Sequence, residues 1–376
     1  MKFIHLADLH LGKKLFGYDL IEEQKEALEA VLQIADQQQV DGVLICGDVY
    51  DTAIPPVNAI DLLDWFLNEL NHRSIDVFMI SGNHDSAGRL GFGNELMKAS
   101  SIHIQTEWKG EIEYVDLNKS DESVRIHFLP FLRPAQVRLQ YECEVENWSD
   151  AIRLALDQAN LKADATNILL SHQFYKGASA SDSEIAYVGT LDEVDSAVLE
   201  KFDYAALGHL HRPQKAGREN NWYPGTLLKF SASEITTEKS ITMIETKMDH
   251  SIEKTLFPLQ LSRDFVKIEG TFEQLVSREF RQKQNLDHYF YIVLDDQQEI
   301  YDAFEKLHAI YPKILSISYA KIRRENEISD YKPLEASHKT PQMIIEEFFA
   351  LQNGVQMDEH QAKLIQSCWE ALHEAD

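Results

Sequence analysis

Side chains that can bind metal ions recur at five places along the chain, and most of them directly follow a short apolar run. They are carboxylates, imidazoles and one amide. In chain order the groups are Asp8 and His10; Asp48 and Asp51; Asn83, His84 and Asp85; His172; and His209 and His211. Donors of these types, delivered from the ends of separate strands, are what a hydrolase with two divalent metal ions requires. The sequence therefore predicts a two-metal hydrolytic site.

The apolar runs before these groups have the length of buried strands, and helical patterns stand between them. Strand-like runs cover residues 3–7, 42–46, 77–80, 125–129, 167–170 and 204–207. Residues 21–39 and 57–71 carry apolar residues at helical spacing. This alternation favours parallel strands with right-handed crossovers, so that ligands lie at the carboxyl ends of the strands. Asp8, Asp48 and Asn83 fall at those ends.

A second region begins near residue 261, after a more β-rich stretch. Strands are expected at 240–245, 254–257, 265–269, 289–294 and 314–322, and helices at 271–280 and 298–310. From about residue 261 the pattern is that of a small α/β domain. We therefore predict three parts: a hydrolase core of residues 1–260, a small α/β domain of residues 261–325, and a linker with a helical tail of residues 326–376.

The tail is expected to contain two short amphipathic helices. Pro341 stands at the first position of one helix and Gly354 ends it, while Asp358 caps the second. The tail holds ten acidic residues against three basic ones. Its aromatic residues either face a partner protein or fold back on this chain, and the sequence leaves both arrangements open.

The composition limits the classes of protein that this chain can belong to. The formal net charge of the 376 residues is -26. Modules that bind DNA are normally basic, so this charge argues against tight binding of nucleic acid by the chain alone. The three cysteines lie far apart, which indicates neither a disulfide framework nor a thiolate metal site. With no signal peptide and no membrane-spanning apolar stretch, we expect a soluble cytoplasmic protein that does not associate with membranes.

The order of the metal-binding groups forms a specific signature. Asp-x-His is followed about forty residues later by Gly-Asp-x-x-Asp, and about thirty-five residues after that by Gly-Asn-His-Asp. This signature resembles the calcineurin-like metallophosphoesterase superfamily, which implies an α/β fold with a β-sandwich flanked by helices. By motif position the resemblance implies one metal held by Asp8, His10 and His211, a second held by Asn83, His172 and His209, and Asp48 bridging both.

Chemistry supports this division of the ligands. Two divalent ions close together repel each other and need a shared carboxylate between them. An oxygen and nitrogen ligand set without thiolate favours Mn²⁺ or another first-row ion. His84 is expected to protonate the leaving oxygen, with Asp85 orienting its ring, although His84 as a further ligand is an alternative. Asp51 either supports the ligands or holds the turn after Asp48.

Basic residues near the motifs are few. Lys13, Arg89 and Arg212 are candidates for binding the substrate phosphate, and solvated loop charges are the alternative interpretation. His5 and His127 lie inside predicted strands and are expected to have no catalytic part.

Longer motifs resemble the SbcD family of bacterial nuclease subunits. The matching segments are residues 5–12, 47–52, 82–86, 171–174, 182–184, 207–214, 223–226 and 233–234. The resemblance implies a manganese-dependent nuclease that degrades duplex ends as an exonuclease and cuts single strands or hairpins as an endonuclease. Its roles would be in DNA repair, recombination and replication. Archaeal and eukaryotic relatives carry a second histidine where Asp51 stands here, so the way in which phosphate is positioned is left open.

The same resemblance implies partners. It indicates a homodimer within a heterotetramer, held by an SbcC-type coiled-coil ATPase. The small domain of residues 261–325 would cap the active site and contact DNA, and the tail helices would dock on the ATPase. Such a partner would supply the basic DNA surface that an acidic chain lacks.

Three other functions compete with this interpretation. A phosphoesterase for a small nucleotide keeps the metal site but needs neither the extra domain nor the paired tail helices. A protein phosphatase of the same superfamily is disfavoured, because Thr52 and Ala53 stand where an arginine would be expected. A scaffold without activity should have lost ligands, and this chain has the full set.

Overall fold

The computed structural model describes residues 1–180, 193–296, 298–320 and 361. Met1–Tyr319 form one compact unit, and Ala320–Asp376 form a second. The two predicted tail helices and the segment 182–184 lie outside the described residues. Within the described part, no helix has the length and apolarity needed to cross a membrane.

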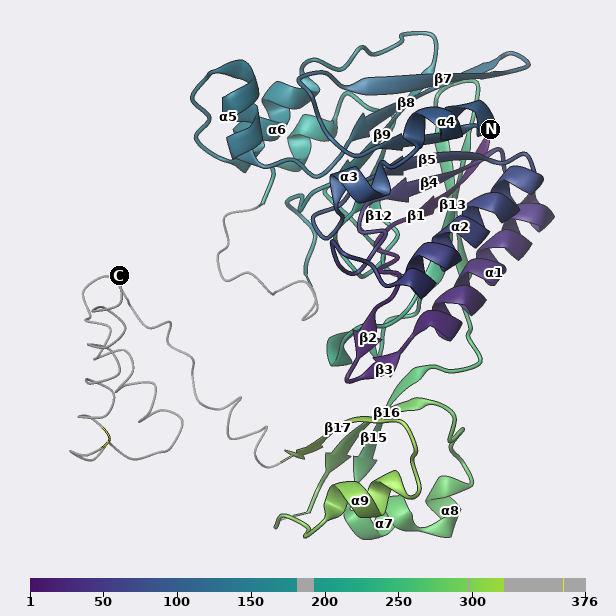
Figure 1. The fold of residues 1–376 in the computed structure, drawn as a ribbon, viewed down its shortest axis with the longest axis vertical. Helices are drawn as coiled ribbons and strands as arrows, with labels where there is room; N and C mark the ends of the chain where they lie inside the picture. The colour runs from purple at the N-terminus through teal and green to yellow at the C-terminus, as the bar shows by residue number, and fades with distance from the viewer. Residues whose placement is uncertain (181–192, 297, 321–360, 362–376) are drawn as a thin grey trace. The chain divides into compact units, whose positions relative to one another are not determined.

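The first of two six-stranded sheets carries the N-terminal strand near its centre (Figure 1). Its order is β14 (Ile252–Pro258), β13 (Ser240–Thr246), β1 (Lys2–Leu6), β4 (Gly42–Cys46), β5 (Asp76–Ile80) and β6 (Ile102–Gln105). The last four strands are parallel, as the alternation predicted, while β13 pairs antiparallel with β1. The helices α1 (Ile21–Gln38) and α2 (Val57–His72) supply the crossovers between β1, β4 and β5.

The second sheet has a parallel centre as well. Its order is β11 (Gln214–Lys215), β12 (Asn221–Tyr223), β10 (Tyr204–Gly208), β9 (Thr166–His172), β8 (Glu122–Leu129) and β7 (Glu113–Lys119). Strands β8, β9, β10 and β12 run parallel. The outermost strands, β11 and β7, pair antiparallel at the two edges.

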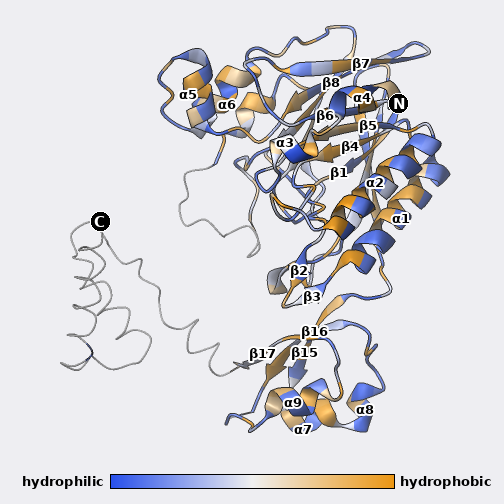
Figure 2. Ribbon diagram, in the orientation of Figure 1, coloured by the Kyte–Doolittle hydropathy of each residue, from blue (hydrophilic) through white to orange (hydrophobic). Residues whose placement is uncertain are grey.

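The two sheets pack face to face. One apolar cluster joins residues of both, including Phe3, Leu44, Phe78, Ile168 and Tyr204. A second cluster lies between the first sheet and α1 and α2, and a third lies between the second sheet and α5 (Pro134–Tyr141) and α6 (Trp148–Leu156). Figure 2 shows hydrophobic residues along the central strands and mixed residues along α1 and α2. The predicted β-sandwich flanked by helices is confirmed.

Residues after β14 form a three-stranded parallel sheet. Its strands are β15 (Phe265–Gly270), β16 (Tyr289–Leu294) and β17 (Ile314–Tyr319). The helix expected at 271–280 is two helices, α7 (Phe272–Val276) and α8 (Arg278–Arg281), because Ser277 has extended backbone and its side chain caps α8. The second expected helix is shorter than predicted, since α9 covers Ala303–His308.

Several short elements lie in the connections between the main strands and helices. They are the hairpin β2 (Lys14–Leu15) and β3 (Tyr18–Asp19), the helices α3 (Ala87–Leu90) and α4 (Asn94–Met97), and three 3₁₀ turns at Lys98–Ser100, Ser196–Leu199 and Ala232–Glu234. None of these was predicted from the sequence, nor were β6, β7, α5 and α6.

Candidate metal centre

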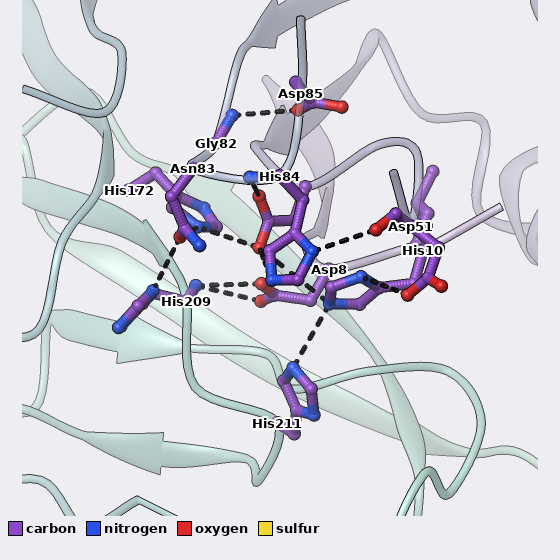
Figure 3. Close-up of polar contacts among 12 residues, drawn as sticks. Asp8, His10, Asp51, Gly82, Asn83, His84, Asp85, His172, His209 and His211 are labelled. Carbon is purple, nitrogen blue, oxygen red and sulfur yellow. Dashed lines mark hydrogen bonds and ion pairs between the residues drawn. The ribbon is translucent and has the colours of Figure 1, made fainter. Parts of the chain in front are cut away.

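The predicted metal-binding side chains meet at one end of the sandwich. Asp8, Asp48 and Asn83 follow β1, β4 and β5, which are neighbours in the first sheet. His172 ends β9, and His209 follows β10 in the second sheet. Because the carboxyl ends of these strands lie together, residues far apart in the sequence form one cluster (Figure 3).

The backbone at the centre is held in an uncommon conformation. Asp8, His10, Asp48 and His209 have φ angles of 53°, 43°, 47° and 106°. Residues other than glycine rarely adopt positive φ, and such strain gathers at functional sites. Hydrogen bonds hold two of these turns together: Asp8 N donates to Gly47 O at 3.0 Å, and His10 N donates to Asp48 O at 3.0 Å.

Two glycines allow the chain to approach itself closely here. A Cβ at Gly82 would overlap the carboxylate and the backbone nitrogen of Asp48, and one at Gly208 would overlap the carbonyl oxygen of Cys46. The loops that carry the donors can therefore meet only if both positions lack a side chain.

One half of the cluster surrounds the Nε2 atom of His172. The Nδ1 atom of this ring lies 2.8 Å from the Cys46 carbonyl oxygen, to which it donates. Nε2 therefore faces Asp48 Oδ2 at 3.3 Å and Asn83 Oδ1 at 3.1 Å. The same Asn83 oxygen lies 3.1 Å from His209 Nδ1. Two imidazole nitrogens and two oxygens thus face one another, a donor set that fits a cation.

The other half contains Asp8, His10 and His211. Their ligand atoms lie within 4.8 Å of one another. The Nε2 atoms of His10 and His211 are 3.2 Å apart, and His10 Nε2 lies 3.9 Å from Asp48 Oδ2. The carboxylate of Asp48 therefore stands between the two halves. The buried oxygen and nitrogen donors fit two divalent cations with one shared ligand.

The charges at the centre also suit cations. Burial raises the pKa of Asp8 to about 7, with a further contribution from Asp48. Burial also acts to raise the pKa of Asp48, but His172, His10 and His84 hold that pKa well below its usual range. For His172 the negative charge of Asp48 outweighs burial and raises the pKa to about 9. Of the two carboxylates, Asp48 therefore carries the negative charge at the centre.

Two of the other imidazoles at the centre stay neutral. Burial lowers the pKa of His10 to about 4 and that of His209 to about 3. A neutral imidazole keeps a lone pair, which is the form that coordinates a metal.

The expectation that Asp85 orients the His84 ring is wrong. The Asp85 carboxylate accepts hydrogen bonds from the backbone nitrogens of Val49 (3.1 Å), Tyr50 (2.9 Å) and Gly82 (2.9 Å). These three amide donors fix the Asp85 carboxylate. Asp85 therefore holds the loop of residues 82–85 against the loop of residues 48–51. Burial raises its pKa to about 6.

The His84 ring is held by Asp51 instead. His84 Nδ1 lies 2.9 Å from the backbone oxygen of Asp51, to which it donates, and Nε2 points towards Asp48 Oδ2 at 3.9 Å. The Asp51 carboxylate lies 2.6 Å from Lys13 Nζ and 3.3 Å from His10 Nδ1. Although burial acts to raise the pKa of Asp51, these two partners lower it to about 2. Asp51 therefore supports both the ring of His84 and that of His10.

A buried ion pair behind His211 was missed from the sequence. Glu234 Oε1 lies 3.8 Å from His211 Nδ1, and Glu234 Oε2 lies 2.6 Å from Lys239 Nζ. Lys239 Nζ also donates to the backbone oxygen of His211 at 2.8 Å. The one signal in the sequence was the match of residues 233–234 to the SbcD motif, which assigned no role to Glu234.

The three candidate phosphate-binding residues differ in their surroundings. Lys13 pairs with Asp51 and lies over the Phe230 ring at 5.1 Å. Arg212 Nη2 donates to Ser233 O at 2.6 Å. Arg89 is exposed on α3, where it donates to Ala53 O at 3.1 Å. Binding of substrate phosphate by these residues stays a prediction. His5 and His127 are fully buried inside β1 and β8, as expected of core residues.

The comparison with protein families identifies this centre. Residues 1–213 match the model of the calcineurin-like phosphoesterases. The chain belongs to this family. Residues 262–353 match a second family model, described as the type 5 capsule protein repressor C-terminal domain.

The similarity to a curated relative extends over nearly the whole chain. The chain is 32% identical over 354 residues to the SbcD subunit of the SbcCD nuclease of Staphylococcus epidermidis, covering 93% of this chain and 92% of that protein. Two solved structures also match: a dimetal phosphatase of Danio rerio (14% identity, TM-score 0.38, 69% of this chain and 98% of that one) and TT1561 of Thermus thermophilus (11%, 0.37, 68% and 98%). The resemblance to the SbcD family is confirmed, and the chain is a metal-dependent phosphodiesterase of the nuclease type.

Proposed function

We propose that this chain is the nuclease subunit of an SbcCD-type complex and hydrolyses phosphodiester bonds of DNA with two Mn²⁺ ions. The observation that carries the proposal is the convergence of the predicted donor side chains, with the Asp48 carboxylate between its two halves, from the ends of strands in both sheets. The similarity to an SbcD protein over 93% of the chain supports DNA as the substrate.

Asp8, His10 and His211 would hold one ion, and Asn83, His172 and His209 the other. Asp48 would contact both, in keeping with its place between the two halves. When bound, two such ions activate water and neutralise the charge that develops on the phosphate. Cys46 O fixes His172 so that Nε2 faces the centre, and the Glu234–Lys239 pair supports His211 from behind. These residues orient the ligands before substrate arrives.

His84 would give a proton to the leaving oxygen. Because its Nδ1 donates to the Asp51 carbonyl oxygen, the proton that can be transferred is the one on Nε2. The His84 side chain is 43% exposed, more than Asp48 beside it at 4%. It can therefore reach a substrate that lies over the centre, which supports a role as general acid.

The substrate class is duplex ends for exonuclease activity and single strands or hairpins for endonuclease activity, in repair, recombination and replication of DNA. The net charge of -26 supports a basic partner that provides most of the DNA contacts. An SbcC-type coiled-coil ATPase is that partner in this proposal, bound by the tail. Lys13, Arg89 and Arg212 would contact the phosphates nearest the centre.

A homodimer is part of the proposal. Five apolar side chains around α2, α3 and α4 are exposed: Ile54, Val57, Ile60, Phe92 and Leu96. Exposed apolar side chains around these helices support association with another protein surface. We therefore place the contact between the two copies on α2 and on the segment after Asp85.

Cleavage of an end-labelled single-stranded oligonucleotide by the purified chain with Mn²⁺, beside Asp48→Ala, tests the proposal. A single strand avoids any need for an ATPase to open a duplex. Cleavage that is lost in Asp48→Ala supports a two-metal nuclease. Hydrolysis of a small nucleotide phosphodiester without DNA cleavage would favour the alternative, a phosphodiesterase for small nucleotides.

A further inference from the structure

A small cavity adjoins the metal centre. It has a volume of about 180 Å³, and Asn83 and His209 are among the residues that line it. Three aromatic side chains, Phe131, Trp148 and Phe174, line it as well. Because Asn83 and His209 belong to the donor cluster, a group in this cavity would lie next to the bond that is cleaved.

Two of the aromatic residues come from elements that carry no metal-binding side chain, and the third comes from the segment after β9, the strand that ends at His172. Phe131 follows β8, Trp148 begins α6, and Phe174 follows β9. The ring centroids of Phe131 and Trp148 are 6.1 Å apart at 45°, and those of Phe174 and His209 are 6.5 Å apart. All three aromatic side chains are partly exposed, so their rings are available to a flat ligand. Base–aromatic stacking is the usual way in which proteins hold single-stranded nucleic acid without sequence preference.

A buried amide in the cavity lacks a hydrogen-bond partner. Gln173 is fully buried and lines the cavity; its Nε2 donates to Leu132 O at 3.0 Å. Its Oε1 has no partner among residues 1–180, 193–296 and 298–320. A buried acceptor left unpaired is costly, which indicates that a ligand brings a donor to it. Every DNA base carries an N–H group on its pairing edge and could supply this donor.

Positive charge lies beside the aromatic rings. The guanidinium carbon of Arg133 is 5.3 Å from the centre of the Phe131 ring. Arg133 is exposed and forms no ion pair with an acidic side chain of the described residues. It can therefore meet the backbone phosphate of a nucleotide whose base enters the cavity.

We propose that this cavity holds one unpaired base of the DNA strand, adjacent to the bond that is cleaved. The inference rests on the proposed nuclease function and adds the conformation of its substrate. The cavity is smaller than the ~300–1,000 Å³ of pockets for drug-sized ligands, which suits a single ring system. A paired base must leave its stack to enter, and a base in a single strand or hairpin loop does so at little cost.

The test is cleavage by the full chain with Mn²⁺ of single-stranded oligonucleotides that carry one abasic site, moved one position at a time. In the wild type, an abasic site at one fixed position from a bond should slow cleavage of that bond about 5- to 150-fold, the loss expected for one base stack. In Trp148→Ala the cleavage rate with the base divided by the rate without it should approach one. Trp148→Phe should restore part of the wild-type ratio. Trp65→Ala, on α2 and outside the cavity, should keep the wild-type ratio.

Three results would overturn the inference. One is a ratio near one in the wild type at every position of the abasic site. This result is measured on the wild type alone, so it does not depend on whether a variant folds. Another is a ratio that persists in Trp148→Ala while circular dichroism shows that variant to be folded. The third is that the wild type hydrolyses a small phosphodiester but cleaves no DNA. That pattern refutes the proposed nuclease function itself, and it differs from the two results above, in which DNA is cleaved.

Discussion

Replacing Glu234 by glutamine is expected to weaken both folding and metal binding. Glu234 is fully buried, and its partner Lys239 is nearly so. Lys239 Nζ donates to oxygen atoms of three described residues: Glu234 Oε2 at 2.6 Å, Thr226 Oγ1 at 2.6 Å and the backbone oxygen of His211 at 2.8 Å, among its contacts. Glutamine has almost the same shape as glutamate, so the substitution changes charge and leaves packing nearly intact.

The size of both effects follows from these contacts. Removing one member of a buried pair leaves the other charge uncompensated, which costs about 3–5 kcal/mol of unfolding free energy. The same carboxylate lies 3.8 Å from Nδ1 of the proposed ligand His211. Loss of a group that orients a histidine ligand weakens metal affinity about 10- to 100-fold.

Two measurements separate the effects: urea unfolding with a chelator, and titration of the folded protein with Mn²⁺. Asp264→Asn is the matched control, because that carboxylate is 46% exposed and pairs with Lys229 Nζ at 2.8 Å. The control should lose at most about 1 kcal/mol and keep its Mn²⁺ affinity. If Glu234→Gln loses stability but binds Mn²⁺ normally, the pair has no part in orienting His211. If stability is unchanged, the reasoning about buried charge is refuted.

Three further perturbations test other parts of the account. His84→Gln should lower kcat about 10²- to 10⁴-fold with Mn²⁺ affinity kept, and a matching loss of affinity would make His84 a ligand instead. Gly82→Ala should abolish Mn²⁺ binding, since its Cβ overlaps Asp48, and normal binding in isothermal titration would contradict this. Burial lowers the pKa of His127 from 6.5 to about 4, so its contribution to stability is present above pH 6.5 and is lost as the pH falls towards 4. In urea unfolding between pH 7 and 5, the wild type should therefore lose about 2 kcal/mol more than His127→Gln, whereas the exposed control His72→Gln should behave as the wild type does.

The core strands and the donor cluster could be predicted because short apolar runs mark both. Buried parallel strands are continuous apolar runs, so segments such as Gly42–Cys46 are visible without tertiary information. Most donors stand shortly after the end of such a run, and the fold rule for parallel sheets brings those ends together. Pairing of β13 with β1 joins residues far apart in the chain, and no local pattern encodes it.

The role of Asp85 could not be predicted because neighbours in sequence need not be neighbours in space. The turn after Gly82 directs the Asp85 carboxylate to three backbone amides and turns the His84 ring to the Asp51 carbonyl oxygen. The backbone groups that lie within hydrogen-bonding distance of Asp85 and His84 depend on how the two loops pack. The residue types alone do not determine this packing. Glu234 was overlooked for the same reason, since it stands 23 positions after His211 in the sequence.

The helix α6 was not predicted from the sequence, for a different reason. Asn147 caps it by accepting from Asp150 N, and Ile152 and Ala155 bury its apolar face. These signals are present in the sequence, but the helix is short and stands in a stretch without metal-binding groups. The cavity beside Trp148 depends on it, so the part of the protein that was not predicted carries the proposed base-binding site.

The most direct test of the account is to count the metal ions at the centre. Electron paramagnetic resonance of the full chain titrated with Mn²⁺ distinguishes free, isolated and paired ions. A centre built around Asp48 should bind two ions per chain with a spin-coupled signal, and the coupling should be lost in Asp48→Ala. One isolated ion per chain, or a coupled pair that survives in Asp48→Ala, would contradict a two-metal centre built around Asp48.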